Sequence, residues 1–282
     1  MTHTACRERP PEGRQSCRPS TLTVATLNVL DDLHLWEHRA PLVLEGFRRH
    51  CPDVIALQEV SLQPDTAQWL AGGLGDYSVH LCPASAHPSS DSLALLCRQP
   101  VCCHEVLPLL QEGRQAHRIE LEHGGTVWTV VNTHLYWNPL RGDVRVKQAE
   151  RLLRWIEGRH PLVLCGDFNA LPASRCLSRL EESLDSAHRV RHGQHAAYTY
   201  PTGLRRGPGL RHSARDAFFR VNGWLRLGRN EQWRASIDHI FVGRGIEVES
   251  CHVIFEQPSP TDDTLYASDH LGVLAALRPG KG

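Results

Sequence analysis

The stretch LVLCGDFNALP, residues 162–172, constrains the fold of this chain more than any other part of its sequence. It opens with a short apolar run that is typical of a buried strand; Gly166 bounds this run, and Pro172 prevents its continuation as a central strand. Side chains alternate along a strand, so Asp167 and Asn169 would point the same way, at the rim of a sheet where open α/β folds keep their sites. The alternative is a turn in which both side chains bond only their own backbone.

The composition indicates a soluble globular protein with one folded domain. Of the 282 residues, 41% are hydrophobic and 22% are charged, and no apolar run approaches the ~20 residues that span a bilayer. Residues 1–20 contain Arg, Pro and Ser but no apolar core of a secretory signal, so we expect a disordered tail there. Residues 21–282 would form the folded domain, in the cytoplasm.

The ten cysteines favour a reducing compartment. Cys97, Cys165 and Cys251 lie in or beside apolar runs and are predicted to be small core residues. Cys102 and Cys103 are adjacent, and the sequence contains no Cys-x-x-Cys pair. Without a secretory signal, this distribution predicts no disulfide framework and again favours the cytoplasm.

The charge of the chain is balanced overall but unevenly distributed. Residues 186–234 contain ten arginines against one aspartate and one glutamate, although the formal net charge of the whole chain is zero. Such a basic segment predicts an anionic ligand nearby, and the alternative is a solvated basic loop. We interpret His188, His192 and His195 as part of that basic surface and not as a metal site.

Apolar periodicity divides the folded part into strands and helices. The middle of the chain is predicted as an antiparallel meander, whereas 187–234 is irregular apart from a strand candidate near Tyr198. In the third predicted helix, Arg145 is placed among the polar positions. Helices are predicted at 36–50, 64–70, 143–157 and 172–184, and strands at 21–28, 54–60, 77–81, 92–97, 102–107, 115–121, 126–134, 162–165, 237–242, 246–255 and 271–277.

Acids, amides and histidines stand at the ends of several of these strands. A buried carboxylate is costly without a partner, so any one of them alone could be a structural ion pair or a cap. Their common position is more than capping requires, and it predicts that they line one site. The residues are Asn28, Glu59, Asn132-Thr133-His134, Asp167, Asn169, Asp238-His239 and Ser268-Asp269-His270.

Six segments resemble, in order, the motifs of the endonuclease/exonuclease/phosphatase superfamily. They are TLNVL, DVIALQEV, VNTHL, LCGDFN, SIDHIFV and SDHL, and the resemblance covers about residues 21–277. The superfamily includes deoxyribonuclease I, abasic-site endonucleases, sphingomyelinases, inositol-polyphosphate 5-phosphatases and deadenylases. The resemblance implies an α/β fold, a four-layer α/β/β/α sandwich in which two packed mixed β-sheets are flanked by helices.

The resemblance also implies roles for these residues in the hydrolysis of a phosphoric ester. Glu59 resembles the principal Mg²⁺ ligand, with Mn²⁺ as an alternative ion, and Asn28 and Asp269 resemble supporting residues of the metal site. Asp167 would orient or deprotonate the attacking water, with His270 as an alternative base. The other implied roles lie at the phosphoryl group: Asn169, His134 and His270 would contact it, Asp238 would orient His270, and Asp91 would orient His134.

The segment THLYWNP and the DVRVKQ that follows it resemble nocturnin, the carbon-catabolite-repression-type deadenylases and the 2′-phosphodiesterases. In that branch, the proline of the segment and an aromatic residue five positions before the I-D aspartate contact the substrate base, which points to Pro139 and Trp233. Asn132 is predicted to contact the substrate as well. The chain departs from the branch at His239, which replaces a tyrosine, and in residues 202–234, which match no motif.

We therefore expect a Mg²⁺-dependent phosphodiesterase that acts on single-stranded RNA, as a deadenylase-like 3′ exonuclease, or on a nucleotide. The alternative is a lipid or inositol phosphate hydrolase, which the basic segment would serve equally well, although no apolar membrane-binding loop is evident. A third reading, an inactive nucleic-acid-binding module, is disfavoured because every motif acid and histidine is present. The sequence does not predict the oligomeric state.

Overall fold

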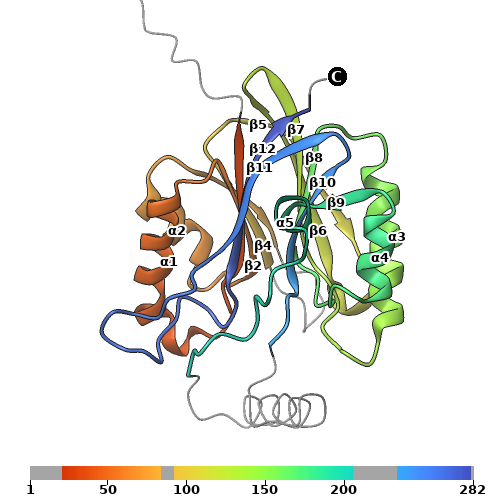
Figure 1. The fold of residues 1–282 in the computed structure, drawn as a ribbon. Coiled ribbons are helices and arrows are strands. Elements are labelled where there is room, and N and C mark those ends of the chain that lie inside the picture. The colour runs from red at the N-terminus through yellow and green to blue at the C-terminus, as the bar shows by residue number, and fades with distance from the viewer. Residues whose placement is uncertain (1–20, 84–91, 206–233, 281–282) are drawn as a thin grey trace, which may run out of the picture.

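Two mixed β-sheets of six strands each pack face to face, and helices cover their outer faces (Figure 1). The computed structural model describes residues 21–83, 92–205 and 234–280. The predicted tail, residues 1–20, lies outside these ranges. The order of layers, from helices through two sheets to helices, confirms the predicted α/β/β/α sandwich.

The first sheet contains both the first and the last strand of the chain. Its order is β11-β12-β1-β2-β4-β3, in which β1 and β2 are parallel and the other neighbours are antiparallel. The amino-terminal strand therefore lies inside the sheet, beside the strand from the other end of the chain. The strands are β1 (Leu22–Asn28), β2 (Val54–Val60), β3 (Ser78–Cys82), β4 (Ser92–Cys97), β11 (Ile246–Ile254) and β12 (Gly272–Pro279).

The second sheet has the order β5-β6-β7-β8-β10-β9, in which β7 and β8 are parallel and the other neighbours are antiparallel. Each sheet thus has one parallel pair whose strands are connected through a helix, so the carboxyl ends of the two strands lie at the same edge. The strands are β5 (Val101–Pro108), β6 (Gln115–His123), β7 (Thr126–His134), β8 (Leu162–Asp167), β9 (Leu184–Ser186) and β10 (Asp238–Gly243).

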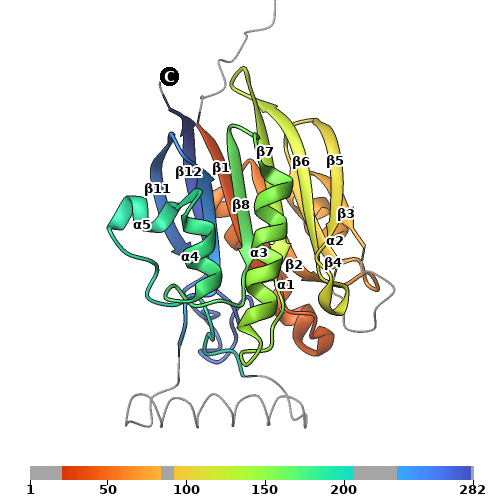
Figure 2. The same cartoon turned by 90° about the vertical axis from the view of Figure 1, so that its right-hand side faces the viewer.

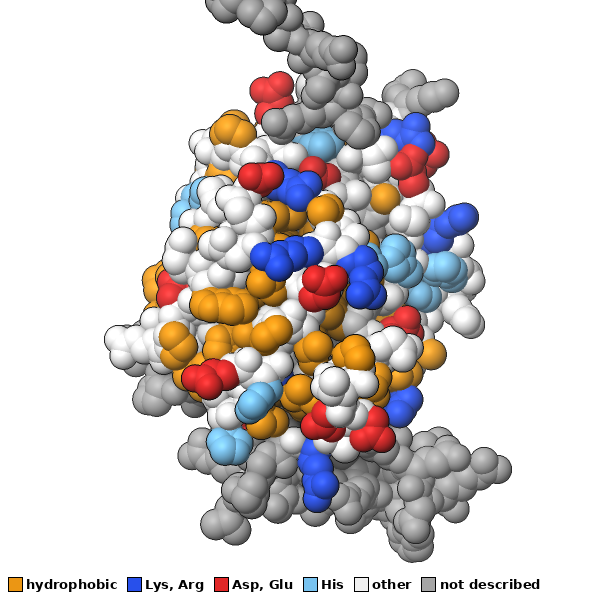
Figure 3. Space-filling model, turned by 90° about the vertical axis from the view of Figure 1, so that its left-hand side faces the viewer, with side chains coloured by type: hydrophobic (Ala, Val, Ile, Leu, Met, Phe, Trp, Pro, Cys, Tyr) orange, Lys and Arg blue, Asp and Glu red, His pale blue; other side chains and the backbone are white. Residues whose placement is uncertain are grey.

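Helices α1 and α2 cover the first sheet, α3 and α4 cover the second, and α5 packs against β10 and β11 (Figures 1 and 2). On the face that carries α1 and α2, hydrophobic side chains gather among charged ones (Figure 3), and Leu62 and Trp69 are 40% and 44% exposed. No helix within the described ranges is long and apolar enough to cross a membrane. The helices are η1 (Leu33–Leu35), α1 (Trp36–His50), α2 (Thr66–Leu74), η2 (Gln111–Gly113), α3 (Gly142–Ile156), α4 (Arg175–Glu181) and α5 (Ala187–His192).

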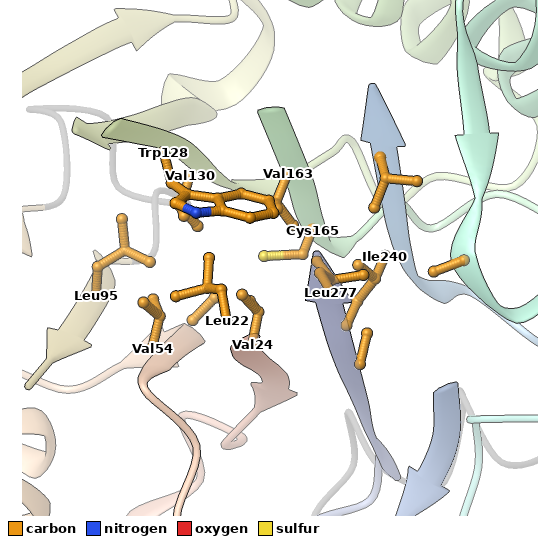
Figure 4. Packing of buried hydrophobic residues seen from close by; sticks show 14 of the residues in the cluster. Leu22, Val24, Val54, Leu95, Trp128, Val130, Val163, Cys165, Ile240 and Leu277 are labelled. Carbon is orange, nitrogen blue, oxygen red and sulfur yellow. The ribbon is translucent and has the colours of Figure 1, made fainter. Parts of the chain in front are cut away.

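A hydrophobic layer fills the space between the two sheets (Figure 4). Leu22 and Val24 of β1 face Val163 of β8 across this layer, and the indole of Trp128 is fully buried in it. The intervening residues of β1 and β8 face outward and pack under the helices. Because both faces of the central strands are covered, these strands have nearly continuous apolar runs. The predicted core cysteines also lie in the layer between the sheets: Cys97, Cys165 and Cys251.

The predicted meander is divided between the two sheets. Strands β3 and β4 pair in the first sheet, whereas β5, β6 and β7 pair in the second. Where the chain crosses over, Gln99 is buried, and its Nε2 lies 3.0 Å from Asp53 Oδ1 and 3.1 Å from His123 Nδ1. The residues on both sides of Gln99 fit the pattern of a strand, and that pattern does not specify which sheet each strand joins.

The region that follows β8 also differs from the prediction. Helix α4 ends at Glu181, and the three-residue strand β9 and the short helix α5 follow it, where a helix to Leu184 and then irregular chain were predicted. The Ser186 side chain accepts a hydrogen bond from the N–H of Arg189 and so caps α5. Near Tyr198 the predicted strand is reduced to one bridge, between residues 200 and 235. Elements of three to six residues are too short to produce a periodic pattern.

Candidate active site

Strand ends from both sheets meet at one edge of the sandwich, the lower edge in Figure 1. The parallel pairs bring the carboxyl ends of β1 and β2 together, and likewise those of β7 and β8. In the second sheet, the register places Asp167 beside His134 on one side and Asp238 on the other. Residues up to 71 positions apart in the sequence thus become neighbours.

Asp167 is the centre of this group and is almost fully buried. Its Oδ2 atom lies 3.1 Å from Asn28 Nδ2, 3.4 Å from His134 Nε2 and 3.9 Å from His270 Nε2. Its Oδ1 atom accepts a 2.8 Å hydrogen bond from the backbone N–H of Asn169. The backbone therefore fixes one oxygen of the carboxylate, while the other oxygen faces an amide and two imidazoles.

Strand alternation does not extend to Asn169, because β8 ends at Asp167. The backbone of Asn169 is left-handed, with φ of 48°, and its Nδ2 donates to the carbonyl oxygen of Leu135 at 3.1 Å. The bond from its N–H to the Asp167 carboxylate is of the kind that the turn alternative described. The backbone N–H of Leu135 also donates to the carbonyl of Asp167, so the loop after β7 is tied to the end of β8.

His270 is held by Asp238. The Nδ1 atom of His270 lies 3.0 and 3.2 Å from the two carboxylate oxygens of Asp238, and both side chains are almost fully buried. Burial by itself would lower the pKa of His270, but the carboxylates of Asp238 and Asp167 outweigh burial and raise this pKa. The backbone N–H of Asp238 donates to Thr199 Oγ1 at 3.1 Å. This pairing fixes the ring of His270 with its Nε2 toward Asp167.

Glu59 reaches the same group through a β-bulge. The pairing of β2 with β4 shifts in register between Leu57 and Val60, and Glu59 has a φ of 55°. A bulge changes the direction of one side chain without ending the strand. As a result, Glu59 Oε1 accepts a 3.0 Å hydrogen bond from Asn28 Nδ2, and its Oε2 accepts one of 3.1 Å from the N–H of Asp31.

Asn28 connects the carboxylates of Glu59 and Asp167. Its Nδ2 donates to both of them, whereas its Oδ1 accepts a 3.0 Å hydrogen bond from the N–H of Leu30. The amide oxygen of Asn28 is therefore turned away from the two acids. In this arrangement Asn28 holds the two acidic groups beside each other. Its predicted support of a metal ion stays a prediction.

Two sets of side chains here have the chemistry of a divalent-metal site. Asp167, Asp238 and His270 each offer a donor atom, and these atoms all lie within 4.8 Å of one another. However, Asp238 and His270 bond each other, and an ion in this group would have to replace that pair. Glu59 is half-buried, and its two oxygens accept hydrogen bonds from Asn28 Nδ2 and from the N–H of Asp31. A carboxylate of this kind suits a hard cation that keeps most of its water.

The segment that carries Asp269 is fixed by two hydroxyl groups. Ser268 Oγ donates to the backbone oxygen of Asn28 at 2.7 Å and accepts a 3.2 Å hydrogen bond from the N–H of His270. Thr202 Oγ1 donates to the carbonyl of Ser268 at 2.7 Å, and its N–H donates to the carbonyl of Asp269 at 2.8 Å. Asp269 itself is buried, and its predicted place in the metal site stays a prediction.

Gly166 permits the close approach of β7 and β8 at the site. Its φ is 138°, and an added Cβ would lie 2.0 Å from the carbonyl oxygen of Thr133. Any other residue would separate the two strands at the position where His134 and Asp167 lie side by side.

Arg39, which the sequence analysis did not identify, holds the first sheet's part of the site. It is fully buried in α1, and its guanidinium donates to four backbone carbonyls. The loop after β1 is thereby bound to the segment that precedes Ser268. A signal was present, because Arg39 stands on the apolar stripe of α1 with Trp36 and Val43. The carbonyls belong to Val29, Leu30, Asp32 and Ala267.

Arg145 holds a loop of the second sheet in the same way, through hydrogen bonds to backbone carbonyls. It was predicted at a polar position of its helix, but it is almost fully buried on the stripe of α3 that includes Val144 and Leu152. Its Nη1 donates to the carbonyls of Tyr136 and Asn138, at 2.9 and 2.7 Å. These bonds are to the loop after β7, so a buried arginine positions this loop as well.

The loop after β7 presents Pro139 and Trp137 to solvent. Trp137 is 52% exposed, yet its Nε1 donates to Glu112 Oε2 at 3.1 Å, and the hydroxyl of Tyr136 donates to Glu112 Oε1 at 3.2 Å. The exposed indole of Trp137, three residues after His134, is thus held in place by Glu112. Pro139 was predicted to contact the substrate base, whereas Trp137, which stands in the same motif, was not identified as a site residue.

Asn132 does not reach solvent, in contrast to its predicted contact with the substrate. It is fully buried, its Oδ1 accepts a 2.7 Å hydrogen bond from Gln58 Nε2, and its Nδ2 donates to the carbonyls of Leu57 and Ala94. All of these partners belong to the first sheet, whereas Asn132 belongs to β7. Its bonds join the two sheets close to the site, so its role here is structural.

Two predicted site residues, Asp91 and Trp233, lie outside the described residues. Their roles, orientation of His134 and contact with the base, therefore stay predictions. Of the three histidines interpreted as basic surface, His195 instead bonds a carboxylate, with its Nε2 3.1 Å from Glu181 Oε1.

The chain is similar to known proteins over most of its length. A model of the Endonuclease/Exonuclease/phosphatase family matches residues 25–270. Protein angel homolog 2 of Mus musculus is 27% identical over 175 residues, which are 52% of this chain and 31% of that protein. Carbon catabolite repressor protein 4 homolog 3 of Arabidopsis thaliana is 28% identical over 166 residues, 52% of this chain and 36% of that protein. The matched part thus spans about a third of the length of these relatives.

A solved structure supports the same assignment of the fold. The structure of D. rerio TDP2 complexed with single strand DNA product has a TM-score of 0.72 at 17% sequence identity, and the match covers 92% of this chain and 99% of that chain. The resemblance read from the motifs is confirmed, both for the superfamily and for its carbon-catabolite-repression branch.

Proposed function

Because this chain belongs to the endonuclease/exonuclease/phosphatase family, a family of phosphoric ester hydrolases, we propose that it is a Mg²⁺-dependent phosphodiesterase. The proposed substrate is single-stranded RNA, degraded from its 3′ end, or a nucleotide. The observation that carries the proposal is the convergence of Asn28, His134 and His270 on one oxygen of Asp167. A carboxylate, an amide and two imidazoles around one point suit an attacking water and a phosphoryl group.

Glu59 would hold the metal ion, with Asp269 as a further oxygen ligand and Asn28 keeping Glu59 in place. The donor chemistry favours Mg²⁺, because carboxylates are hard oxygen ligands and Mg²⁺ keeps several of its waters; Mn²⁺ is the second candidate. When bound, the ion would stabilise negative charge on the phosphoryl oxygens and the leaving group.

The residues around Asp167 would carry out the proton transfer and bind the phosphoryl group. Asp167 would orient the attacking water and accept its proton, because one of its oxygens is fixed by the N–H of Asn169. His270, with its raised pKa, would donate a charged hydrogen bond to a phosphoryl oxygen, and Asp238 would keep its ring in this orientation. His134 would contact a second oxygen, and Asn169 would reach the group with its second amide proton.

The loop after β7 supports the choice of a substrate that has bases. Pro139 and Trp137 are exposed on a loop that Arg145 fixes beside His134. Stacking of a base on an exposed aromatic ring contributes about 1–3 kcal/mol and does not require a particular base. The structure of D. rerio TDP2 complexed with single strand DNA product supports a single-stranded nucleic acid as the class of substrate.

A substrate panel tests this proposal. The purified chain is incubated with an oligoadenylate, a mixed single-stranded RNA, bis-p-nitrophenyl phosphate and an inositol phosphate, each with Mg²⁺ and with EDTA. We expect hydrolysis of both RNAs and of the synthetic diester that depends on Mg²⁺. Hydrolysis of the inositol phosphate alone would instead support the lipid or inositol phosphate alternative, and no hydrolysis of any substrate would contradict the proposal.

Glu59→Ala tests the metal ligand. We expect a loss of at least about 100-fold in kcat on the synthetic diester, because a carboxylate ligand is removed. Glu122→Ala is the matched control, since Glu122 is exposed on β6 and this variant should retain full activity. Equal rates for the two variants would exclude Glu59 from the metal site.

A further inference from the structure

Three histidines lie close together on strands at one edge of each sheet, away from the residues of the candidate active site. His80 lies on β3, the edge strand of the first sheet, and His104 lies on β5, the edge strand of the second, while His117 lies on the neighbouring β6. The ring centres of His80 and His104 are 6.2 Å apart, and those of His104 and His117 are 4.6 Å apart. In Figure 2, β3 and β5 lie at the same side of the molecule.

The three side chains differ in burial, from the surface inward. His104 is exposed, His80 is half-buried, and His117 is fully buried. Within the described parts of the chain, neither ring nitrogen of His117 has a hydrogen-bond partner. A buried polar group without a partner is rare in folded proteins, and each instance requires an explanation such as an ion or an ordered water.

Burial and neighbouring imidazoles determine the charge state of His117 and His80. Burial and the neighbouring His104 and His80 lower the pKa of His117 to about 3, and burial and His104 lower the pKa of His80. The rings of His117 and His80 are therefore neutral at pH 7, with a lone pair available on one nitrogen. Neutral imidazole is the form of histidine that binds metal ions.

We propose that His80, His104 and His117 form a binding site for a transition-metal ion of the Zn²⁺ class, separate from the candidate active site. Nitrogen ligands suit Zn²⁺, Cu²⁺ and Ni²⁺, whereas Mg²⁺ requires oxygen ligands, so the two sites would select different ions. The donor atoms of the three histidines are farther apart than those of Asp167, Asp238 and His270. Metal binding must therefore move the exposed ring of His104 inward. The ion would satisfy His117 and connect β3 to β5.

The neighbouring groups Ser78, Glu105 and Cys82 have other partners or a raised pKa. The Nε2 atom of His80 lies 3.0 Å from the hydroxyl of Ser78, a bond that a small ring rotation exchanges for a metal bond. Glu105 is paired with Arg118. Burial raises the pKa of the Cys82 thiol to about 12, so this thiol stays protonated at neutral pH.

The test is a titration of the whole purified chain with Zn²⁺ in an excess of Mg²⁺, which occupies the hard-cation site. Isothermal calorimetry should detect one Zn²⁺ per chain, and Co²⁺ in its place should give the visible absorption of a nitrogen-ligated site. His104→Ala should weaken Zn²⁺ binding by at least about tenfold, because a ligand is lost. His80→Ala should have a similar effect, and His38→Ala, which changes an exposed histidine of α1, should have none.

Two further readouts exclude an indirect effect. His104→Ala removes an exposed side chain, so its melting temperature without metal and its hydrolytic activity should equal those of the unmodified chain. Zn²⁺ should raise the melting temperature of the unmodified chain but not that of His104→Ala. The proposal is overturned if Zn²⁺ binds equally well to both proteins, or if excess Mg²⁺ displaces it. Either result is independent of whether the chain hydrolyses phosphodiesters.

Discussion

His270 and His239 are both almost fully buried. Asp238 directly precedes His239 in the sequence, but its carboxylate bonds the ring of His270. His270 faces the carboxylates of the site, whereas His239, on the other face of β10, contacts the rings of Phe168 and Phe241. The pKa of His270 is raised by Asp238 and Asp167 against the effect of burial. The pKa of His239 is lowered to about 3 by burial and by His195.

The comparison shows that burial does not determine what a histidine can do in this protein. Consecutive residues of a strand point to opposite faces, so one step along β10 leads from a site with carboxylates to an apolar, aromatic layer. With a carboxylate, a buried imidazole can carry a proton; without one, it stays neutral and acts as a packing group. Substitutions on the site face should therefore change activity, and those on the packing face should change stability.

The largest effect should follow from Asp167→Ala on the site face. We expect kcat on bis-p-nitrophenyl phosphate to fall by at least about 1000-fold, because the carboxylate that accepts the proton of the water is lost. The melting temperature should stay the same or rise, since a buried acidic group is removed next to Asp238 and Glu59. Steady-state kinetics and a thermal melt on the same sample measure both. A variant that retains activity would remove Asp167 from the mechanism.

Asp238→Asn tests the comparison directly, because it replaces the carboxylate that bonds His270 with a neutral amide. The contacts of His270 would then be more like those of His239, which packs against neutral rings. The kcat should fall by about 100-fold, since the ring loses the charge that favours its protonated form. The size and position of the side chain are almost unchanged, so far-UV circular dichroism should be unaffected. His239→Gln is the control from the other face, and its kcat should remain within about twofold of the unmodified chain. Equal losses in the two variants would contradict the distinction between the faces.

Trp137→Ala extends the comparison to two exposed indoles, Trp137 on the loop after β7 and Trp69 on α2. Loss of a stacking surface worth about 1–3 kcal/mol should raise KM for an oligoadenylate by roughly 5- to 150-fold and leave the synthetic diester unaffected. Trp69→Ala is the matched control, because Trp69 is exposed to a similar extent on α2. If Trp137→Ala weakens both substrates equally, it acts on the loop and not on the base.

The smallest effect should be a change in the pH dependence of stability in His239→Phe. The folded-state pKa of about 3 lies below the ordinary value, so His239 contributes stability above pH 6.5 that is lost as the pH falls from 6.5 toward 3. A neutral buried histidine lowers the free energy of unfolding by up to about 1.4 kcal/mol per pH unit in this window. Urea denaturation at pH 7.5 and 5.5 should show a smaller loss in the variant. An unchanged slope would mean that His239 accepts a proton without cost.

Residues near each other in the sequence determined much of the fold and of the candidate site. Helix α1 and strands β2, β4 and β7 have the bounds that the apolar pattern predicted. The motif residues at the strand ends, among them Asn28, Asp167 and His270, could be predicted from the sequence, because period-two alternation and turn residues act within a few positions of the chain. The same local information placed Cys165 in the core.

Only the tertiary structure determined the orientation of the site side chains and the hydrogen bonds that hold them in place. The bulge at Glu59, the arginines on the apolar stripes of α1 and α3, and the burial of Asn132 all depend on partners from other elements. Arg39 bonds the carbonyl of Ala267, which is 228 positions away, and Asn28 bonds Asp167 across 139 positions. A hydrogen bond between such residues forms only after both sheets are packed, so no pattern along the chain specifies it. The sequence supplied the chemical groups, and the packing of the two sheets gave them a common centre.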